Sequence, residues 1–346
     1  MSQIKQNVDT PKQVISKKYL FFSISLSLLT MAGVIWYTYT PGILAYLAPK
    51  RLPGLGIALV VSFLRVWFSA AKIRFLSAGV ISWLGAFRVQ LSWDFTSAVT
   101  PSTIGGAPMA TYAMTKEGLR LGESTAIILY SVLLDQIWFA IAIPILLVAG
   151  IYMDVVPPSV GFLGEASMLI LYVSLLSYAG VLAYGVLIKP SAISKIIKWF
   201  AKLPFLRKHR GKIHSEAQNL EQYAHQLKAK PFRFLLQAFF YSTMSWLARV
   251  ALAPIVILSL LPAPELLSVL RSLAMNLAFL VVPTPGGSGG VEGLFVLFQG
   301  PLISRAAFIG LALFLWRIIS YYITIAMGMM ATTWYVNQEV HEYKSN

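Results

Sequence analysis

Residues Val282–Gly293 read VPTPGGSGGVEG, and this stretch decides the fold. It lies between the apolar runs Leu273–Val282 and Leu294–Phe298, so it is expected at membrane depth. A continuous α-helix cannot pass through it, because the prolines remove backbone donors and clash with the preceding turn, while the glycines disfavour helix. Membranes tolerate such backbone only where protein or a water-filled cavity shelters it from lipid. We therefore predict a broken, re-entrant helix pair with a functional tip; the alternative is a hairpin loop outside the membrane.

The composition is that of an integral membrane protein. Of 346 residues, 57% are hydrophobic and 12% are charged, and the mean hydropathy is +0.70. Such a chain has too little polar surface to cover a soluble globule. The absence of cysteine excludes disulfides and thiolate metal sites. The net charge of +15 lies next to apolar segments, so we attribute it to anionic lipid headgroups and to the positive-inside rule, not to nucleic acid.

Hydropathy predicts an all-α polytopic membrane protein with six full transmembrane helices and two re-entrant broken-helix pairs. The first apolar run is too long for a signal peptide and has no small-residue cleavage site, so we expect it to be retained. A second helix break is expected at residues 100–108, which read TPSTIGGAP. The six predicted spans are Tyr19–Thr40, Leu55–Phe75, Ser124–Gly150, Ser167–Ile188, Phe234–Leu261 and Ser304–Val336.

Charge divides the chain into two membrane halves and predicts their orientation. Residues 1–18 form a cytoplasmic tail, 19–188 the first half with its break near 100–108, and 189–233 a basic cytoplasmic linker with eleven Lys and Arg residues. Residues 234–336 form the second half with its break near 283–293, and 337–346 a cytoplasmic tail. The loop Ile151–Glu165 has no Lys or Arg and is expected outside. The linker is expected to be helical and to lie at the membrane surface; its histidines do not share one helical face and predict no metal site.

Three residues of the first half have counterparts at similar positions in the second half. The order of span, broken pair and span therefore occurs twice, in opposite orientations. Inverted repeats with discontinuous helices are typical of secondary transporters, whose substrates bind where the breaks converge. Relative to Pro101 and Pro283, the pairs are Arg65 and Arg249 (36 and 34 residues before), Asp94 and Asn276 (seven before), and Asp135 and Arg317 (34 after).

Charged residues inside the predicted membrane segments are the candidate site. A charge at the bilayer centre costs at least ~2.5–3.5 kcal/mol, so it persists only if paired, hydrated or used. Structural ion pairing is the alternative for any one of them. Arginine clamps phosphate with two parallel bonds, and the amides of Gly286–Gly290 would add an anion-attracting helix start. Glu292 could cap free donors there, or serve as a proton or cation site for coupling. The candidate substrate-binding residues are Arg65, Asp94, Ser102, Thr103, Gly105, Gly106, Asp135, Arg249, Pro283, Pro285, Gly286, Gly287, Ser288, Gly289, Glu292 and Arg317.

The motif Pro283-x-Pro285-Gly286-Gly287-x-Gly289-x-x-Glu292 resembles the signature of the membrane domain of bacterial lysylphosphatidylglycerol synthase/flippases and their stand-alone relatives. The first half resembles that family through Pro101-x-x-x-Gly105-Gly106-x-Pro108, Gly118-x-x-x-Gly122-Glu123 and Asp135, and the resemblance covers roughly Leu55–Val336. It implies movement of lipids such as aminoacylated phosphatidylglycerol between leaflets, and relatives are linked to polyprenyl-phosphate carriers and glycolipid export. The aminoacyl-transferase domain is expected to be absent, and Met109-Ala110-Thr111 stands where a basic residue was expected after Pro108.

We therefore expect a lipid transporter or flippase that moves an anionic or aminoacylated phospholipid, or a polyprenyl-phosphate-linked lipid, between leaflets of the cytoplasmic (inner) membrane. The alternative is a membrane-embedded lipid-modifying transferase with Asp94, Asp135 or Glu292 as base; a scaffold without transport is a third. No nucleotide-binding motif is present, and no cofactor or metal is expected. The expected partners are membrane lipids, and nucleic acid is not expected. A homo-oligomer and a separately encoded lipid-synthesising enzyme are compatible with this prediction.

Overall fold

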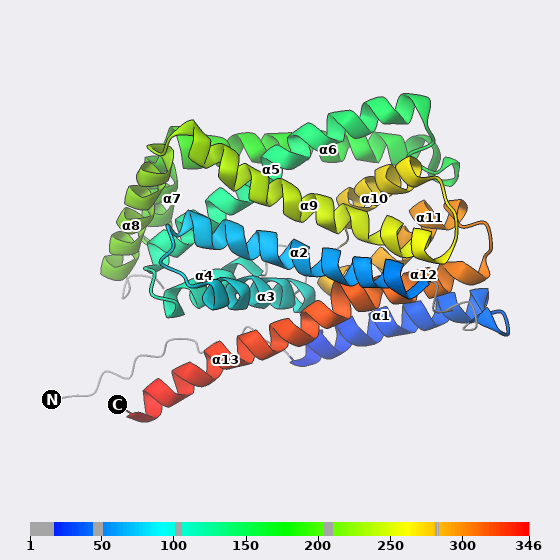
Figure 1. Ribbon diagram of the computed structural model, residues 1–346. Helices are drawn as coiled ribbons and strands as arrows, with labels where there is room; N and C mark the ends of the chain where they lie inside the picture. The colour runs from blue at the N-terminus through cyan, green and yellow to red at the C-terminus, as the bar shows by residue number, and fades with distance from the viewer. Residues whose placement is uncertain are drawn as a thin grey trace.

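The computed structural model describes residues 17–43, 51–100, 106–203, 210–280, 282 and 284–345, and these are helices and short connections without a β-strand (Figure 1). Within these ranges, six helical segments are long and apolar enough to cross a membrane, as the sequence predicts. They are α1 (Lys17–Thr38), α2 (Leu52–Leu76), α5 (Leu121–Tyr152), α6 (Gly161–Ala183) with the π-helical turn η5 (Tyr184–Ile188), α9 (Phe232–Leu260), and the last span. The last span consists of α12 (Ala307–Arg317), the π-helical segment η9 (Ile318–Tyr322) and α13 (Ile323–Ser345).

Four shorter helices form two packed pairs, α3 with α4 and α10 with α11. They have 17, 11, 15 and 10 residues, whereas a spanning helix needs about 20. The pairs lie toward opposite ends of the helix bundle (Figure 1). That they are re-entrant and related as inverted repeats stays a prediction. Their bounds are Trp83–Val99 for α3, Gly106–Lys116 for α4, Glu265–Phe279 for α10 and Gly290–Gln299 for α11.

The first break is shorter than the sequence predicts. Helix α4 begins at Gly106 and includes Pro108, because the first helical turn has no intrahelical acceptor for its amides and therefore tolerates proline. Helix α3 begins at Trp83, after the N-cap Ser82 whose hydroxyl accepts the Gly85 amide at 3.0 Å, and it ends at Val99. The rest of the predicted break, including Ser102, Thr103 and Gly105, lies outside the described residues, as does Pro283.

Helices α2 and α9 pack along each other and hold the two halves together. One apolar core gathers α9, α10, α11 and α12 with parts of α2 and α5. A second core gathers α2, α3, α4 and α5. Because α2, α5 and α9 contribute to both cores, the halves form one bundle, and the polar groups between α2 and α9 lie in its interior.

The basic linker forms two helices, α7 (Pro190–Phe200) and α8 (Arg210–Lys228), so its predicted helicity is confirmed. Helix α8 packs on α5 and α7. The carboxylate of Glu216 accepts the Gly122 amide at 2.8 Å, and a Cβ at Gly122 would come within 2.3 Å of the Glu216 carbonyl oxygen. The hydroxyl of Tyr223 donates to the carbonyl of Leu76 at 2.8 Å. The connections between the described helices include the short 3₁₀ turns η4 (Pro158–Val160), η7 (Pro285–Gly287) and η8 (Gly300–Leu302).

Candidate functional site

The loop between α10 and α11 is a compact turn that only glycine can form. Gly286, Gly287 and Gly289 have φ angles of 59°, 66° and 82°, in the left-handed region that other residues avoid. A Cβ at Gly286 would lie 2.6 Å from the carbonyl oxygen of Ala98, the next-to-last residue of α3. The backbone of this loop therefore touches the last turn of α3, just before the first predicted break, and we call this Gly286–Ala98 approach the contact between the breaks.

A buried ion pair follows this loop. The fully buried carboxylate of Glu292, in the first turn of α11, accepts hydrogen bonds through Oε1 from Arg317 Nε at 2.7 Å and from the Ser27 hydroxyl. Its Oε2 accepts the amide of Gly289 at 2.8 Å. Tyr322 donates to Ser27 at 2.9 Å. The carboxylate thus neutralises the arginine and caps the helix start at the same time.

Helix α1 contacts both the end of α3 and the glycine-rich loop through one hydroxyl, that of Ser23. Ser23 Oγ lies 3.1 Å from the carbonyl oxygen of Ala98 and 3.0 Å from that of Pro285. It also lies 2.9 Å from Ser288 Oγ and 3.0 Å from Tyr321 Oη. A hydroxyl has one proton, so Ser23 donates to one of these carbonyls at a time. This Ser23 node makes α1 part of the site.

A second polar region, which we call the α2–α9 seam, runs between these two helices. Arg65 and Lys72 lie two turns apart on α2, and Ser242 and Arg249 lie two turns apart on α9. Arg65 forms an ion pair with Asp94 of α3 at 3.0 Å. Lys72 forms an ion pair with Asp135 of α5 at 2.8 Å and donates to Ser242 at 3.3 Å. Between them, Ser69 and Ser245 share a hydrogen bond of 2.7 Å.

Arg249 is the cation of this seam that has no counter-ion. It is half-buried and stacks on Trp246, with 5.0 Å between its Cζ and the ring centroid. Among the residues that the structure describes, it has neither a hydrogen bond nor an ion pair. Its neighbour Val250 accepts a hydrogen bond from Ser272 of α10 at 2.6 Å. One turn farther along α10 lies Asn276, whose amide donates to the Ser272 carbonyl at 2.8 Å.

The seam therefore carries an unbalanced positive charge. In the first half, Arg65 has Asp94 as its partner; the predicted counterparts in the second half are Arg249 and Asn276, and an amide cannot neutralise an arginine. The seam contains the cations Arg65, Lys72 and Arg249 and the carboxylates Asp94 and Asp135, which leaves one positive charge in excess. A buried uncompensated charge is costly unless it is hydrated or meets a counter-charge.

The predicted site residues thus separate into two groups. Arg65, Asp94, Asp135 and Arg249 line the seam, whereas Glu292, Arg317 and the loop of Pro285–Gly289 form the contact between the breaks. Gly106 lies at the close approach of α4 to α3, where a Cβ would come within 2.5 Å of the Trp93 carbonyl oxygen.

Three of the five amides at Gly286–Gly290 already have acceptors within the protein, and an anion site there stays a prediction. The amides of Gly287 and Ser288 donate within the loop at 2.9 and 3.1 Å, and that of Gly289 donates to Glu292. A glycine-rich turn satisfies its own donors when a carboxylate follows it at the third helical position. The cap role that the sequence suggests for Glu292 is confirmed.

Sequence reasoning missed the polar residues whose partners lie far away in the chain. Lys72 is not among the candidate residues from the sequence, although its seven-residue spacing from Arg65 puts both on one face. Ser23 and Ser27 have the four-residue spacing of one helical face in the first apolar run, which was the available signal. Other missed residues of the two regions are Ser69, Ser242, Ser245, Tyr321 and Tyr322.

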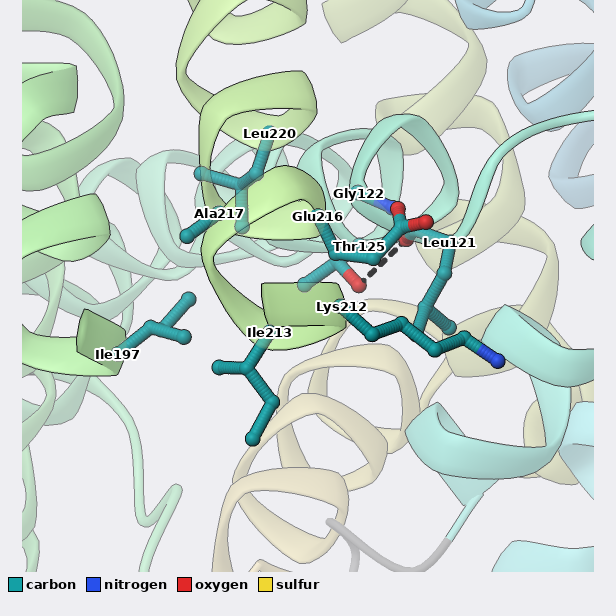
Figure 2. A pocket seen from close by; sticks show the side chains of 9 residues that line it. All are labelled: Leu121, Gly122, Thr125, Ile197, Lys212, Ile213, Glu216, Ala217 and Leu220. Carbon is teal, nitrogen blue, oxygen red and sulfur yellow. Dashed lines mark hydrogen bonds between the residues drawn. The ribbon is translucent and has the colours of Figure 1, made fainter. Parts of the chain in front are cut away.

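A separate hollow of about 220 Å³ lies between α5, α7 and α8 (Figure 2). Its lining is mainly apolar, with Ile197, Ile213 and Leu220, and the dashed line marks the hydrogen bond that the Thr125 hydroxyl donates to the Leu121 carbonyl at its edge. Neither ion pair of the seam contributes to it. Within the described ranges, no group of three or more His, Asp or Glu side chains could hold a metal ion.

Comparison with known proteins decides the family. Residues 21–328 match the family described as the lysylphosphatidylglycerol synthase TM region. The chain belongs to this family. The matched region contains every charged residue of the seam and of the Glu292–Arg317 pair, and the resemblance seen in the sequence is confirmed. A UPF0104 membrane protein of Archaeoglobus fulgidus is 24% identical over 314 residues, which cover 87% of this chain and 92% of that protein.

Proposed function

We propose that this member of the lysylphosphatidylglycerol synthase TM region family moves a lipid with an anionic headgroup between membrane leaflets. The observation that carries the proposal is Arg249, a half-buried arginine without a carboxylate partner beside two complete ion pairs. A phosphate would supply the missing negative charge. The lipid classes that fit are an anionic or aminoacylated phospholipid and a polyprenyl-phosphate-linked lipid.

The seam can hold such a headgroup while acyl or prenyl chains stay in the bilayer. Arginine binds phosphate through two parallel charge-assisted hydrogen bonds. Stacking on Trp246 holds the Arg249 guanidinium in place without using its N–H donors. Arg65 Nε is also buried without a hydrogen-bond partner among the described residues. Two arginines with unused donors therefore flank the position where a phosphate would balance the charge.

Transport explains the carboxylates better than catalysis does. Asp94, Asp135 and Glu292 each form an ion pair with a cationic nitrogen no more than 3.0 Å away, so their oxygens are already engaged within the protein. A lipid transferase would need one of them as a general base. We therefore propose a transporter that is not an enzyme, driven by the lipid gradient or by an ion gradient.

The two short helix pairs are proposed to be inverted re-entrant repeats that meet at the contact of Gly286 with Ala98. Their opposite placement in the bundle and their lengths support this. With six spans, both termini would lie on one side, and the basic linker favours the cytoplasm. The inner membrane, a homo-oligomer and a separately encoded lipid-synthesising enzyme belong to the same proposal.

The test is leaflet exchange of fluorescent lipids in proteoliposomes, with anionic, zwitterionic and polyprenyl-phosphate headgroups compared. Asn276→Asp would place a carboxylate in the position that Asp94 occupies in the first half. We expect it to pair with Arg249 and to lower exchange of anionic lipids about tenfold or more, since one lost phosphate contact of ~1.4 kcal/mol corresponds to a factor of ten. Arg249→Ala should have a similar effect.

Asn276→Leu is the matched control, because it changes the same buried position without adding a charge. It should leave anionic-lipid exchange near that of the unmodified protein, provided that thermal unfolding shows an intact fold. If Asn276→Asp and Asn276→Leu reduce exchange equally, the effect is one of packing and Arg249 is not the headgroup site. Loss of a lipid species from cells, with exchange unaffected, would favour the transferase.

A further inference from the structure

Helix α7 lies where a membrane span ends. The span Leu169–Ile188 finishes one residue before the N-cap of α7, Lys189, whose φ and ψ of −134° and 73° turn the chain out of the preceding helix. Helix α7 has 11 residues, too few to cross a bilayer. Its position after the span places it at the boundary between hydrocarbon and water.

One face of α7 exposes large apolar side chains. Ser194 is fully buried and α7 packs on α8. On the exposed side, Ile196, Trp199 and Phe200 are 56%, 61% and 50% exposed. In water this would be an unfavourable surface, whereas interfacial helices bury such residues among lipid headgroups and upper acyl chains.

Lysines accompany these apolar side chains. Lys195 and Lys198 lie one turn apart on α7, and Lys202 follows two residues after the helix ends. With Ile196, Trp199 and His214 of α8 they line a hollow of about 480 Å³, and no carboxylate lines it. Within the part of the chain that the structure describes, none of the three lysines has an ion pair.

We propose that this α7 site, formed by Lys195, Ile196, Lys198, Trp199, Lys202 and His214, binds the phosphate of an anionic phospholipid in the adjacent leaflet. The charge requires an anion, and the apolar side chains require that the anion be attached to acyl chains. A soluble anion would leave Ile196, Trp199 and Phe200 in water. Each lysine near an anionic surface strengthens its attraction about fivefold.

The α7 site is distinct from the α2–α9 seam, which uses none of its residues. The proposal therefore holds whether or not the protein moves lipid. It assigns the linker a lipid-binding role and predicts that anionic lipids are preferred over zwitterionic lipids next to α7.

The experiment uses Trp199 as the probe. The full chain is placed in nanodiscs that contain either phosphatidylglycerol or phosphatidylcholine with brominated acyl chains, which quench nearby tryptophan. Subtracting the signal of Trp199→Phe isolates this residue from the other tryptophans. We expect brominated phosphatidylglycerol to quench Trp199 several-fold more efficiently than brominated phosphatidylcholine at equal mole fraction, and high salt to reduce the difference.

Two variants with equal charge changes separate the site from general electrostatics. Lys195→Gln/Lys198→Gln/Lys202→Gln should abolish the preference for phosphatidylglycerol. Lys212→Gln/Lys230→Gln/Arg233→Gln removes three exposed charges from the same linker and should preserve it. Equal quenching by the two lipids, or equal losses in the two triple variants, would overturn the proposal. Displacement of brominated phosphatidylglycerol by inorganic phosphate would also overturn it, in favour of a soluble anion.

Discussion

Arg317 approaches Glu292 through two nitrogens, with Nε 2.7 Å and Nη2 2.6 Å from the same carboxylate oxygen. The side chains are 4% and 0% exposed. Because the other carboxylate oxygen is bound to the Gly289 amide, the pair connects the last span, α11 and the glycine-rich loop. It therefore fixes the end of the loop, at Gly289, to the last span.

Glu292→Gln should destabilise the protein by about 3–5 kcal/mol, because it leaves Arg317 as a buried charge without a partner. Adding Arg317→Met should recover part of that loss, since the unpaired charge is then removed. Thermal unfolding in detergent measures both. Additive losses in the double variant would show that the two residues do not act as a pair.

Gly286→Ala should destabilise the protein by at least 1–2 kcal/mol, roughly the cost of a left-handed conformation for a residue with a side chain. The added Cβ would also push α3 away at Ala98. Gly293→Ala is the matched control in the same motif, because it is helical and has nothing within 4 Å of its Cβ position. It should be neutral or stabilising by up to about 1 kcal/mol. Equal destabilisation by both would contradict the proposed contact between the breaks.

The net charge of the seam should tune the response to anionic lipids. Lys72→Gln removes its excess positive charge, and Asp135→Asn raises it. A unit charge on the order of 10 Å away changes binding by roughly 1.5 kcal/mol at an effective dielectric constant of about 20, which is about tenfold. We expect Lys72→Gln to raise the concentration of anionic lipid that half-saturates exchange in the proteoliposome assay. Asp135→Asn should lower it. Changes in the same direction for both variants would show that the net charge of the seam does not determine the affinity for anionic lipid.

Docking of α8 should weaken at high pH. Burial, with a smaller contribution from the Glu123 carboxylate, raises the pKa of Tyr223 from 10.0 to about 12. The folded state therefore retains the Tyr223 proton where the unfolded state has lost it, so stability is full below pH 10 and falls as the pH rises through about 12. Hydrogen exchange of α8 measures this.

Tyr223→Phe is the control for that pH dependence. It removes the hydrogen bond to the Leu76 carbonyl and should cost about 0.5–1.5 kcal/mol at neutral pH. The difference in α8 protection between this variant and the unmodified protein should disappear above pH 12. A difference that is constant from pH 8 to 12 would show that Tyr223 does not titrate as its surroundings imply.

The sequence predicts the spans well because hydropathy is a local property: each of the six apolar runs corresponds to a helix. It also predicts which charged residues lie within the helices of the membrane region, since a charge in an apolar run is conspicuous. The partners of these charged residues do not follow from the sequence. Asp94 and Asp135 were candidates without assigned partners, because contacts such as Ser27 with Glu292 join residues 265 positions apart. No periodicity encodes them; they follow from how α1 and the last span cross the breaks.

The π-helical segment Ile318–Tyr322 lets two consecutive tyrosines reach α1, with Tyr321 at Ser23 and Tyr322 at Ser27. Such a segment carries one residue more per turn than the α-helix around it. Closing it to α-helical geometry would rotate α13 relative to α12 by about 100°. That single step would break a tyrosine contact at the Ser23 node and withdraw Thr324 from Arg65. The surplus residue in the last span therefore couples the contact between the breaks to the seam through one register change.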